Sequence, residues 1–118
     1  MQNHRPRTPS FPRSLTSVEI AALIAVVRLD GLGYGTAIHD DLEGFLGRPI
    51  STAAVYAALD RLERKRLLRS TRSAPLAVQG GRSKRLYELT RSGRIFLEDE
   101  RAEATRLWQA LPSRFFRG

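Results

Sequence analysis

The stretch Ser51–Leu68, STAAVYAALDRLERKRLL, decides the fold of this chain. Its apolar residues recur at helical spacing, which predicts a helix that buries one side through Val55, Leu59 and Leu62. The opposite side combines small residues with a tyrosine, an aspartate and two arginines: Ser51, Thr52, Ala53, Tyr56, Ala57, Asp60, Arg61 and Arg64. Such a face suits the major groove of DNA, because a bulky tip would clash there while arginines reach phosphates or guanine edges.

Length and composition limit what the rest of the chain can be. With 118 residues it makes one domain, and small domains often gain stability by forming dimers. The absence of cysteine excludes disulfides, thiolate metal sites and cysteine nucleophiles. The longest apolar run, residues 20–27, is too short to cross a bilayer, and the basic N-terminus lacks the features of a signal peptide. We therefore expect a cytoplasmic, nucleoid-associated protein without membrane contact.

The net charge of +8 points to an acidic partner, and the excess is concentrated in three segments. Residues 1–14 contain three arginines and no acid. Residues 48–73 have seven basic residues against two acids, and residues 74–94 have five against one. Residues 15–47 are acidic overall, and residues 95–118 are balanced. The charge therefore surrounds the helix quoted above and the segment that follows it.

One apolar helix is predicted before the quoted stretch. Thr16-Ser-Val-Glu19 has the form of a capping box, with Leu15 and Ile20 placed as a hydrophobic staple, so a helix begins there. It runs to about Leu29, where the glycine-rich segment Asp30–Gly35 ends it. The helix is apolar on nearly all sides, which places it at the centre of the core with Ile20, Leu23, Ile24, Val26 and Val27.

A second helix is predicted over residues 35–45. Its apolar residues are Ile38, Leu42 and either Phe45 or Leu46. The connector 47–50 contains Pro49, which bars continuation of the helix. Ser51 then caps the quoted helix, which runs to about residue 65. Two helices with such a short connector form a helix-turn-helix pair.

The hydrophobic period changes after this pair. Leu68–Arg72 is predicted as a short strand, and Lys84–Leu89 alternates as a half-buried strand does. The segment 73–83 between them is rich in serine, proline and glycine, with Gly80-Gly81 at the predicted tip. Two strands joined by a basic loop after a helix-turn-helix pair make a winged helix.

A last helix is predicted from Thr90 or Ser92 to about Leu111. Ile95 and Phe96 are expected to pack on the domain. Further apolar residues form one stripe close to heptad spacing: Leu97, Ala104, Trp108 and Leu111. A long amphipathic helix outside a complete core needs a partner surface, and a second copy of the chain is the simplest one.

The predicted fold class is therefore mainly α with a small β-hairpin (α+β), a winged helix-turn-helix with a C-terminal dimerisation helix. Residues 1–14 are predicted to be a disordered basic arm, because they contain three prolines and almost no apolar content. Residues 15–90 form the winged helix and residues 91–112 the dimerisation helix. Residues 113–118 form a frayed tail. The arm is either a solvated tail or a contact to the DNA backbone or minor groove.

The pattern Gly33-Tyr-Gly-x-x-Ile38, followed by Ser51-x-x-x-Val-Tyr56-x-x-Leu59-x-Arg-Leu-Glu63-x-x-x-Leu67-Leu68, resembles the DNA-binding domain of PadR-family transcriptional regulators. The segment Gly81-Arg-Ser-Lys-Arg-Leu-Tyr87-x-Leu-Thr90-x-x-Gly93-Arg94 is similar to the wing and the following helix in that family. The resemblance covers residues 15–98. One departure is Arg66, which stands where the family generally has a glycine that closes the recognition helix. Arginine is less favourable than glycine in the left-handed conformation that such a position requires.

The resemblance implies a winged-helix homodimer that binds operator DNA, usually as a repressor. A two-fold dimer implies a pseudo-palindromic double-stranded operator. The expected DNA-binding residues are Thr36, Ser51, Thr52, Ala53, Tyr56, Ala57, Arg61, Arg64, Arg82, Lys84 and Arg85. The expected dimer interface or effector pocket consists of Leu97, Ala104, Trp108 and Leu111.

Several of these residues have two interpretations. Ser51 or Thr52 caps the helix in either case, and a phosphate contact is compatible with that role. Tyr56 is a core residue or a DNA contact, and Arg61 and Arg64 are solvated charges or phosphate contacts. Trp108 is an anchor of the dimer interface or, as in some family members, a stacking wall for a small planar aromatic effector.

The sequence predicts neither an enzyme nor a cofactor. The acidic clusters lie on predicted solvent-facing helix surfaces, and no serine has a plausible histidine partner. His4 and His39 lie far apart, so each is expected to be an ordinary surface histidine and no metal site is expected. Two other functions stay open: a basic RNA-binding protein, disfavoured by the lack of an exposed aromatic platform, and a winged-helix module for protein partners.

Overall fold

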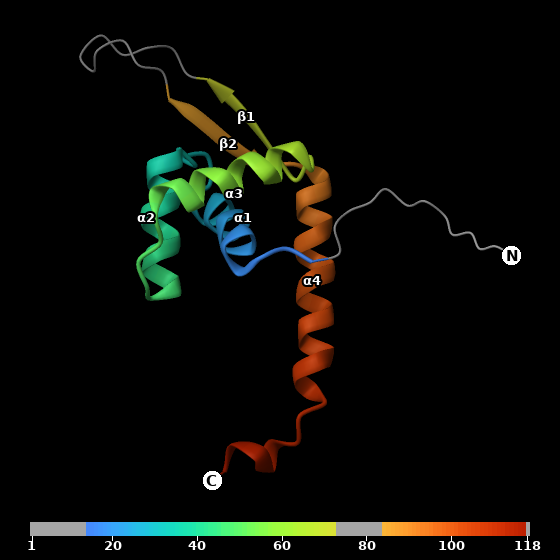
Figure 1. Cartoon of the computed structure of the whole chain (residues 1–118). Helices are drawn as coiled ribbons and strands as arrows, with labels where there is room; N and C mark the ends of the chain where they lie inside the picture. Colours follow the sequence, from blue (N-terminus) through green and yellow to red (C-terminus); the bar gives the residue numbers. More distant parts are fainter. Residues whose placement is uncertain (1–13, 73–83, 118) are drawn as a thin grey trace, which may run out of the picture.

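The computed structural model describes residues 14–72 and 84–117. Three helices pack together beneath a two-stranded hairpin, and a fourth helix runs away from them (Figure 1). The elements are α1 (Ser17–Leu29), α2 (Gly35–Leu46), α3 (Thr52–Arg64), β1 (Leu68–Arg72), β2 (Arg85–Leu89), α4 (Arg91–Gln109) and the short 3-10 helix η2 (Ser113–Phe116). The predicted fold class, mainly helical with one hairpin, is confirmed. The expectations for residues 1–13 and for the loop 73–83 lie outside the described residues.

The capping box at the start of α1 forms as predicted. The Thr16 hydroxyl accepts a hydrogen bond from the Glu19 amide at 3.1 Å, and the Glu19 carboxylate accepts one from the Thr16 amide at 2.9 Å. The helix ends at Asp30, whose backbone is left-handed with φ 44°. Both ends of α1 are therefore set by local hydrogen bonds and backbone conformation.

The inner face of α1 differs from the predicted one. Leu23 and Val26 are buried, but Ile24 and Val27 are 38% and 51% exposed, so placing them in the core was wrong. Alanines take their place in the core: Ala21, Ala22 and Ala25. A helix that is apolar on nearly all sides has no polar stripe to show which side faces outward, and small residues allow the neighbouring helices to approach closely.

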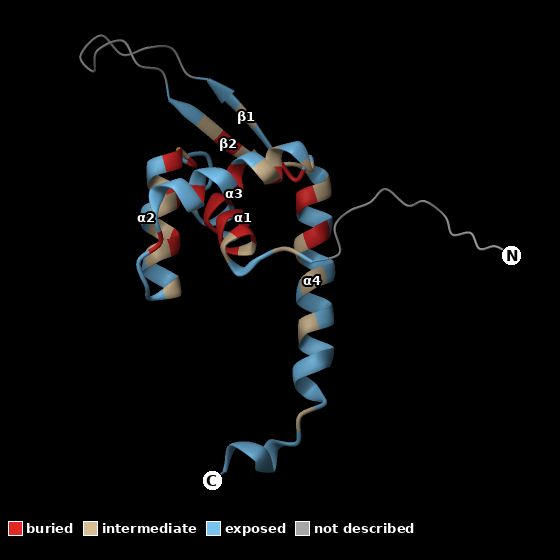
Figure 2. Ribbon diagram, viewed as in Figure 1, coloured by how far each residue is buried: buried red, intermediate tan, exposed pale blue. Residues whose placement is uncertain are grey.

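The core lies between α1, α2 and α3 and extends under the hairpin to the start of α4 (Figure 2). The apolar side predicted for the quoted helix is confirmed, because Val55, Leu59 and Leu62 are fully buried. Ile38 and Leu42 of α2 are buried against the same centre. The helix-turn-helix pair is thus held by its apolar sides, and its polar sides face outward.

The hairpin is antiparallel, with Leu68 opposite Leu89 and Arg72 opposite Arg85. Its inner strand also pairs with the segment between α1 and α2. The Tyr87 amide donates to the Gly33 carbonyl at 2.9 Å, and Tyr34 forms a bridge with Leu86. This connection was not predicted, and it fixes the base of the hairpin to the helix-turn-helix pair.

The end of α3 is closed in the way that the family's glycine would close it, but by an arginine. Arg66 has φ 63°, its amide donates to the Glu63 carbonyl at 3.0 Å, and the Leu67 amide donates to the Leu62 carbonyl at 2.9 Å. These bonds form a Schellman motif around a left-handed residue. The geometry at Arg66 is therefore the one a glycine favours, and arginine adopts it at some cost in stability.

The start of α4 is fixed against this same turn. The Thr90 hydroxyl donates to the Arg66 carbonyl at 2.7 Å and accepts from the Gly93 amide at 2.9 Å. A side chain at Gly93 would overlap the Leu67 carbonyl, so only glycine allows the helix to lie this close. The direction of α4 relative to the domain is therefore set at its first turn.

Beyond its second turn, α4 has few contacts with the rest of the chain. Phe96 is buried and Leu97 is half-buried against the core, whereas Ile95 is exposed, so the expectation that Ile95 packs on the domain was wrong. Leu107 and Trp108, near the far end, are 68% and 64% exposed. Figure 2 shows the change from buried to exposed residues along the helix.

Candidate nucleic-acid interface

The N-terminal end of α3 is exposed and built from small residues. Ser51 is the N-cap, and its hydroxyl accepts a hydrogen bond from the Ala54 amide at 3.0 Å. Thr52, Ala53 and Ala57 are exposed, as the sequence predicted for this face. The first-turn amides of a helix can bind an anion, and side chains this small let the helix end approach a surface closely.

Tyr56 lies at the junction of the two helices. Its ring packs against the backbone of Gly35, the first residue of α2, where any side chain would overlap the ring. The tyrosine is also partly exposed, so it is neither a core residue nor a freely solvated one. Thr36 follows Gly35 and is exposed. The packing therefore fixes the position of the Tyr56 ring relative to the start of α2.

His39 ties α2 to the connector before α3, a role that the sequence reading missed. Its Nε2 lies 2.8 Å from the Ile50 carbonyl oxygen and its Nδ1 lies 3.1 Å from the Asp40 carboxylate. The Glu43 carboxylate accepts from the Ile50 amide at 2.8 Å. The expectation of an ordinary surface histidine was wrong, because the side chain is only 19% exposed and both ring nitrogens have partners.

These contacts raise the pKa of His39. The hydrogen bond to the Ile50 carbonyl contributes most, and the one to Asp40 adds to it, since both favour the protonated ring. The only sequence signal was the i,i+4 spacing of His39 and Glu43, and the contact with Ile50 across eleven residues could not be seen from it. The connector is therefore held by two side chains of α2.

The same residues are the one three-residue group in the described part of the chain whose ligand atoms lie within 4.8 Å of one another: His39, Asp40 and Glu43. Their ring and carboxylate atoms already serve the hydrogen bonds that hold the connector. The closeness of these three side chains is thus explained by the hydrogen bonds that tie α2 to the connector.

Arg61 points back toward the domain. Its Nε lies 2.6 Å from the Glu19 carboxylate, whose side chain is only 3% exposed, and the Lys65 ammonium lies 3.6 Å from the same carboxylate. Burial raises the pKa of Glu19, but the hydrogen bonds from Arg61 and from the Thr16 backbone outweigh it and hold the pKa below its ordinary value. Arg61 therefore serves as the counter-ion of a buried carboxylate. The sequence had suggested either a solvated charge or a phosphate contact, and this role is neither of them.

A signal for this pair existed in the sequence. Glu19 shares a helix face with Ala22, Leu23 and Val26, at spacings of three, four and seven residues. All three are buried, so the capping-box glutamate had to lie at the core edge and needed a cation. The identity of that cation, 42 residues away, was not available from periodicity.

The other predicted arginine of α3 and the basic residues at the loop side of the hairpin lie at the surface. Arg64 lies 3.5 Å from Asp60, the i,i+4 pair expected from the sequence, and both side chains are 69% exposed. Arg85 donates to the Ser70 hydroxyl at 2.9 Å, and the Lys84 ammonium lies 5.7 Å from the centre of the Tyr34 ring. Arg82 lies outside the described residues.

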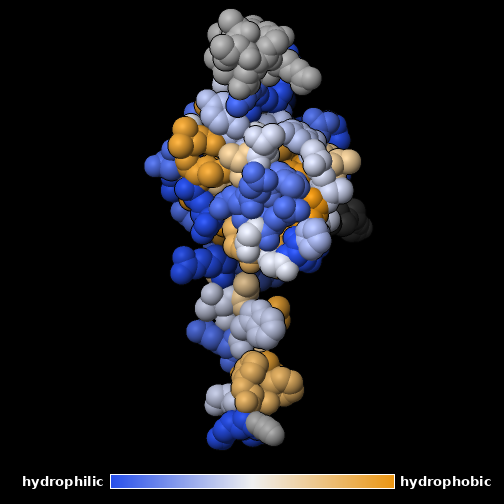
Figure 3. Space-filling view, turned by 90° about the vertical axis from the view of Figure 1, so that its left-hand side faces the viewer, coloured by the Kyte–Doolittle hydropathy of each residue, from blue (hydrophilic) through white to orange (hydrophobic). Residues whose placement is uncertain are grey.

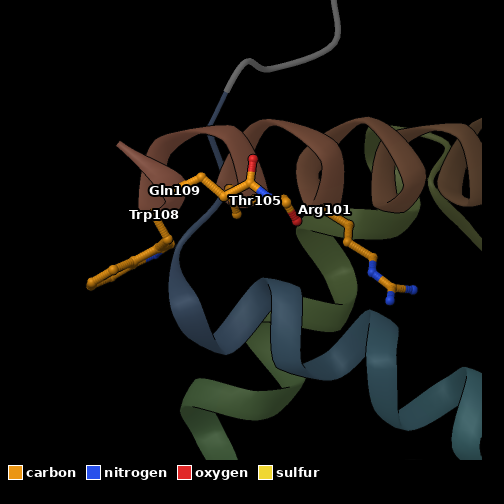
Figure 4. Close-up of a pocket in the computed structure, with 5 residues that line it drawn as sticks. Arg101, Thr105, Trp108 and Gln109 are labelled. Atoms are coloured by element: carbon orange, nitrogen blue, oxygen red, sulfur yellow. The ribbon is translucent and has the colours of Figure 1, made fainter. Parts of the chain in front are cut away.

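The predicted stripe on α4 divides into two parts. Leu97 packs on the domain's own core, and Ala104 is half-buried beside the exposed Trp108. A surface pocket of about 410 Å³ is lined by Arg101, Ala104, Thr105, Trp108 and Gln109. All of these residues come from α4, and the Trp108 ring stands out from the helix (Figure 4). The pocket therefore has a single wall, formed by one helix.

None of the described helices combines the length and the apolar character that crossing a membrane requires.

A helix-turn-helix pair followed by an antiparallel hairpin defines a winged helix. The model of the family described as "Transcriptional regulator PadR-like family" matches residues 23–99, and the chain belongs to this family. Its members are DNA-binding transcriptional regulators and not enzymes. Among curated proteins, none matches the chain.

Solved structures agree with this assignment. A PadR family transcription regulator from Clostridium difficile is 27% identical, with a TM-score of 0.65 over 80% of this chain and 94% of that one. RosR from H. salinarum is 25% identical, with a TM-score of 0.65 over 89% of this chain and 87% of that one. BpsR from Bordetella bronchiseptica, whose DNA binding is regulated by 6-hydroxynicotinic acid, is 23% identical, with a TM-score of 0.63 over 85% of this chain and 67% of that one.

Proposed function

We propose that this chain is a homodimeric repressor that reads a pseudo-palindromic operator through α3. The observation that carries the proposal is the exposed face of α3: small residues from Ser51 to Ala53 at the tip, with Tyr56 behind them, packed against Gly35. A helix end of this shape fits the major groove, and the packed tyrosine presents a fixed edge to the bases. Such a regulator acts on the DNA of the cytoplasmic nucleoid.

Two sets of contacts support a reading role for α3 by keeping it in place. His39 and Glu43 hold the connector before it, and Glu19 holds its last turns through Arg61. A recognition helix must keep its position to within a fraction of an ångström, because base-edge hydrogen bonds depend on geometry. We assign Arg61 mainly to this support and Thr36, Ser51, Thr52, Ala53, Tyr56 and Ala57 to the groove.

We assign the positive charge of the hairpin to the DNA backbone. Lys84 and Arg85 are exposed at the start of β2, and Arg82 precedes them in the sequence. Contacts to phosphate add affinity without sequence preference and make binding depend on salt. Arg64, exposed at the end of α3, is a further phosphate contact in this proposal.

Selection of bound duplexes from a random pool tests the proposal, because a two-fold operator is expected with half-sites about one helical turn, roughly 34 Å, apart. With the selected operator, Tyr56→Phe removes the hydroxyl but leaves the ring against Gly35. It should reduce the difference in affinity between the operator and mismatched duplexes. Arg85→Ala should weaken all duplexes alike and lower the salt slope by about one unit. Arg106→Ala, at an exposed α4 position away from this surface, is the matched control.

Recovery of no discrete duplex, or tighter binding to RNA in a competition, would contradict the DNA-reading proposal. The first result would favour the winged-helix protein module, and the second the RNA-binding alternative.

We further propose that the outer half of α4 pairs with the same helix of a second copy. Apolar side chains lie on the narrow stem formed by α4 and the segment after it (Figure 3). Leu107, Trp108, Phe115 and Phe116 are each more than three-fifths exposed. Apolar side chains gathered on a projecting helix are typical of an interface, and a two-fold dimer would place two copies of α3 on successive grooves.

The Trp108 pocket is the proposed site of a small planar aromatic effector. With only one wall in the single chain, it would be completed by the second copy, so that an effector stacks between two Trp108 rings. The regulation of BpsR by an aromatic acid supports an effector of this class. Trp108 is the only tryptophan, so quenching of the intrinsic fluorescence by aromatic acids measures binding directly. An unquenched signal with a preserved dimer would refute the effector and leave Trp108 as an interface anchor.

A further inference from the structure

A basic hollow lies at the end of α3 opposite to Ser51, where α3, β1 and α4 meet. It has a volume of about 610 Å³, within the range of small-molecule sites. Four arginines from these elements and their connections line it, together with the hydroxyl residues at the start of α4: Arg64, Arg66, Arg69, Arg91, Thr90 and Ser92. No function proposed above uses Arg66, Arg69 or Arg91.

Part of this positive charge has no partner in the protein. Arg69 lies 3.2 Å from Glu88, and Arg64 has the loose, exposed pair with Asp60. Within residues 14–72 and 84–117, the guanidinium groups of Arg66 and Arg91 form no hydrogen bond or ion pair, although the Arg66 backbone is hydrogen-bonded to Glu63 and Thr90. The one acid that lines the hollow, Glu63, accepts the Ser70 hydroxyl at 2.7 Å. Two guanidinium groups are therefore available to an anion.

The start of α4 adds to the positive potential. The N-terminus of a helix carries a partial positive charge, and acidic residues usually stabilise its first turn. The first turn of α4 contains no acidic residue and begins with Arg91. Arg91 therefore lies at the positive end of the α4 dipole, which is unfavourable. Arg64, in contrast, lies at the negative end of the α3 dipole, where a positive charge is favourable. An anion in the hollow would remove this unfavourable arrangement.

The backbone at Arg66 supports the same conclusion. Arginine is held there in a left-handed conformation that glycine adopts at lower cost. The Thr90 hydroxyl donates to the Arg66 carbonyl and fixes the turn, and Arg66 lines the hollow together with Thr90 and Arg91 of the α4 start. The guanidinium group is thus available at a position where the family pattern has no side chain.

We propose that this hollow binds a small molecule carrying a phosphate group, with Arg66 and Arg91 as its principal ligands. Guanidinium groups bind phosphate oxygens through paired, charge-assisted hydrogen bonds, and a concave site with several arginines favours a dianion over chloride. The site lies at the opposite end of α3 from the proposed groove-reading tip, because α3 has 13 residues and so spans about 20 Å between Ser51 and the hollow. Only Arg64 belongs both to the hollow and to the proposed phosphate contacts with DNA. It does not depend on the proposed DNA function.

The test is a titration of the full-length chain with inorganic pyrophosphate at constant ionic strength, followed by amide NMR. Saturable shifts are expected at residues 66–70 and 91–92, and sodium chloride at the same ionic strength should not produce them. Arg66→Gly is the decisive variant, since glycine suits the backbone and the protein should fold at least as well. It should weaken pyrophosphate binding about tenfold or more, as the loss of a charge-assisted contact does.

Arg91→Gln should weaken binding to a similar degree, and Arg106→Ala, on the same helix but outside the hollow, should leave it unchanged. Shifts that do not saturate, or that persist unchanged in Arg66→Gly, would overturn the proposal. It would also be overturned if Arg66→Gly weakened duplex binding while the wild-type protein ignored pyrophosphate, because the phosphate recognised would then belong to DNA.

Discussion

The two halves of α4 differ in what holds them. The first two turns are fixed by Gly93 against the Leu67 carbonyl, by the Thr90 hydroxyl and by the buried Phe96 ring. The last turns project from the domain with Leu107 and Trp108 exposed. An isolated helix of about ten residues is only marginally stable in water. The comparison teaches that the domain's core is complete without the outer half of α4, the part that we propose to pair with a second copy of the chain.

The largest effect is expected from the buried half. Phe96→Ala removes a core aromatic ring and should lower the free energy of unfolding by about 3–4 kcal/mol. Ile95→Ala, one residue earlier and exposed, is the control and should lower it by less than about 1 kcal/mol. Urea unfolding followed by circular dichroism measures both. Equal losses would mean that the inner half of α4 is not anchored by Phe96.

Gly93→Ala should be nearly as harmful, although it adds only one methyl group. The new carbon would overlap the Leu67 carbonyl, and moving α4 away should cost about 3 kcal/mol. Gly44→Ala is the matched control, since its added carbon, in the last turn of α2, meets nothing within 4 Å. It should stabilise the protein by about 0.5–1 kcal/mol. Thermal unfolding of the two variants would contradict this account if they changed the midpoint in the same direction.

Arg61→Ala should lower the free energy of unfolding by about 2–3 kcal/mol at neutral pH, because it leaves the Glu19 carboxylate buried with only Lys65 nearby. Arg64→Ala removes an exposed pair and should change it by less than about 0.5 kcal/mol. Since the pKa of Glu19 is held below 4.5, the stabilisation by the pair is present above that pH and is lost as the pH falls through the folded-state pKa. The difference between the wild type and Arg61→Ala should therefore shrink on acidification. A pH-independent difference would rule out the charge pair as its source.

The smallest effect on monomer stability is expected from the outer half. Trp108→Ala should change the free energy of unfolding of the monomer by less than about 0.5 kcal/mol, because the ring is exposed in the single chain. It should nevertheless weaken the proposed dimer about tenfold or more, as the loss of a buried aromatic anchor does. Sedimentation over a range of concentrations separates the two quantities. A dimer constant equal to that of the wild type would place the partner surface elsewhere.

Local signals were enough to predict most of the fold. The Thr16–Glu19 capping box, Pro49 and the period change at Leu68 each act over a few residues, and the elements begin and end where these signals stand. The family pattern also identified Gly35 and Gly93, whose close contacts with Tyr56 and the Leu67 carbonyl are visible only in the structure.

The errors share one cause, which is contact between distant residues. Nothing local to Arg61 indicates that Glu19 lies beneath it, and nothing local to His39 indicates the Ile50 carbonyl. Ile24 and Val27 were misplaced because α1 has apolar residues on all sides, so that its neighbours, and not its own period, decide which side is buried. The basic hollow was missed for the same reason, since three elements must meet to form it.

The glycine contact at the base of α4 has a mechanical consequence. The helix has 19 residues and is therefore about 28 Å long, a rigid rod fixed at one end. A tilt of about 6° at Gly93 would displace its far end by about 3 Å, half the width of the DNA minor groove. Small changes at the turn formed by Arg66, Leu67 and Thr90 are thus magnified along the rod. In a two-fold assembly joined through α4, this turn would act as a pivot, and its angle would set the distance between the two copies of α3.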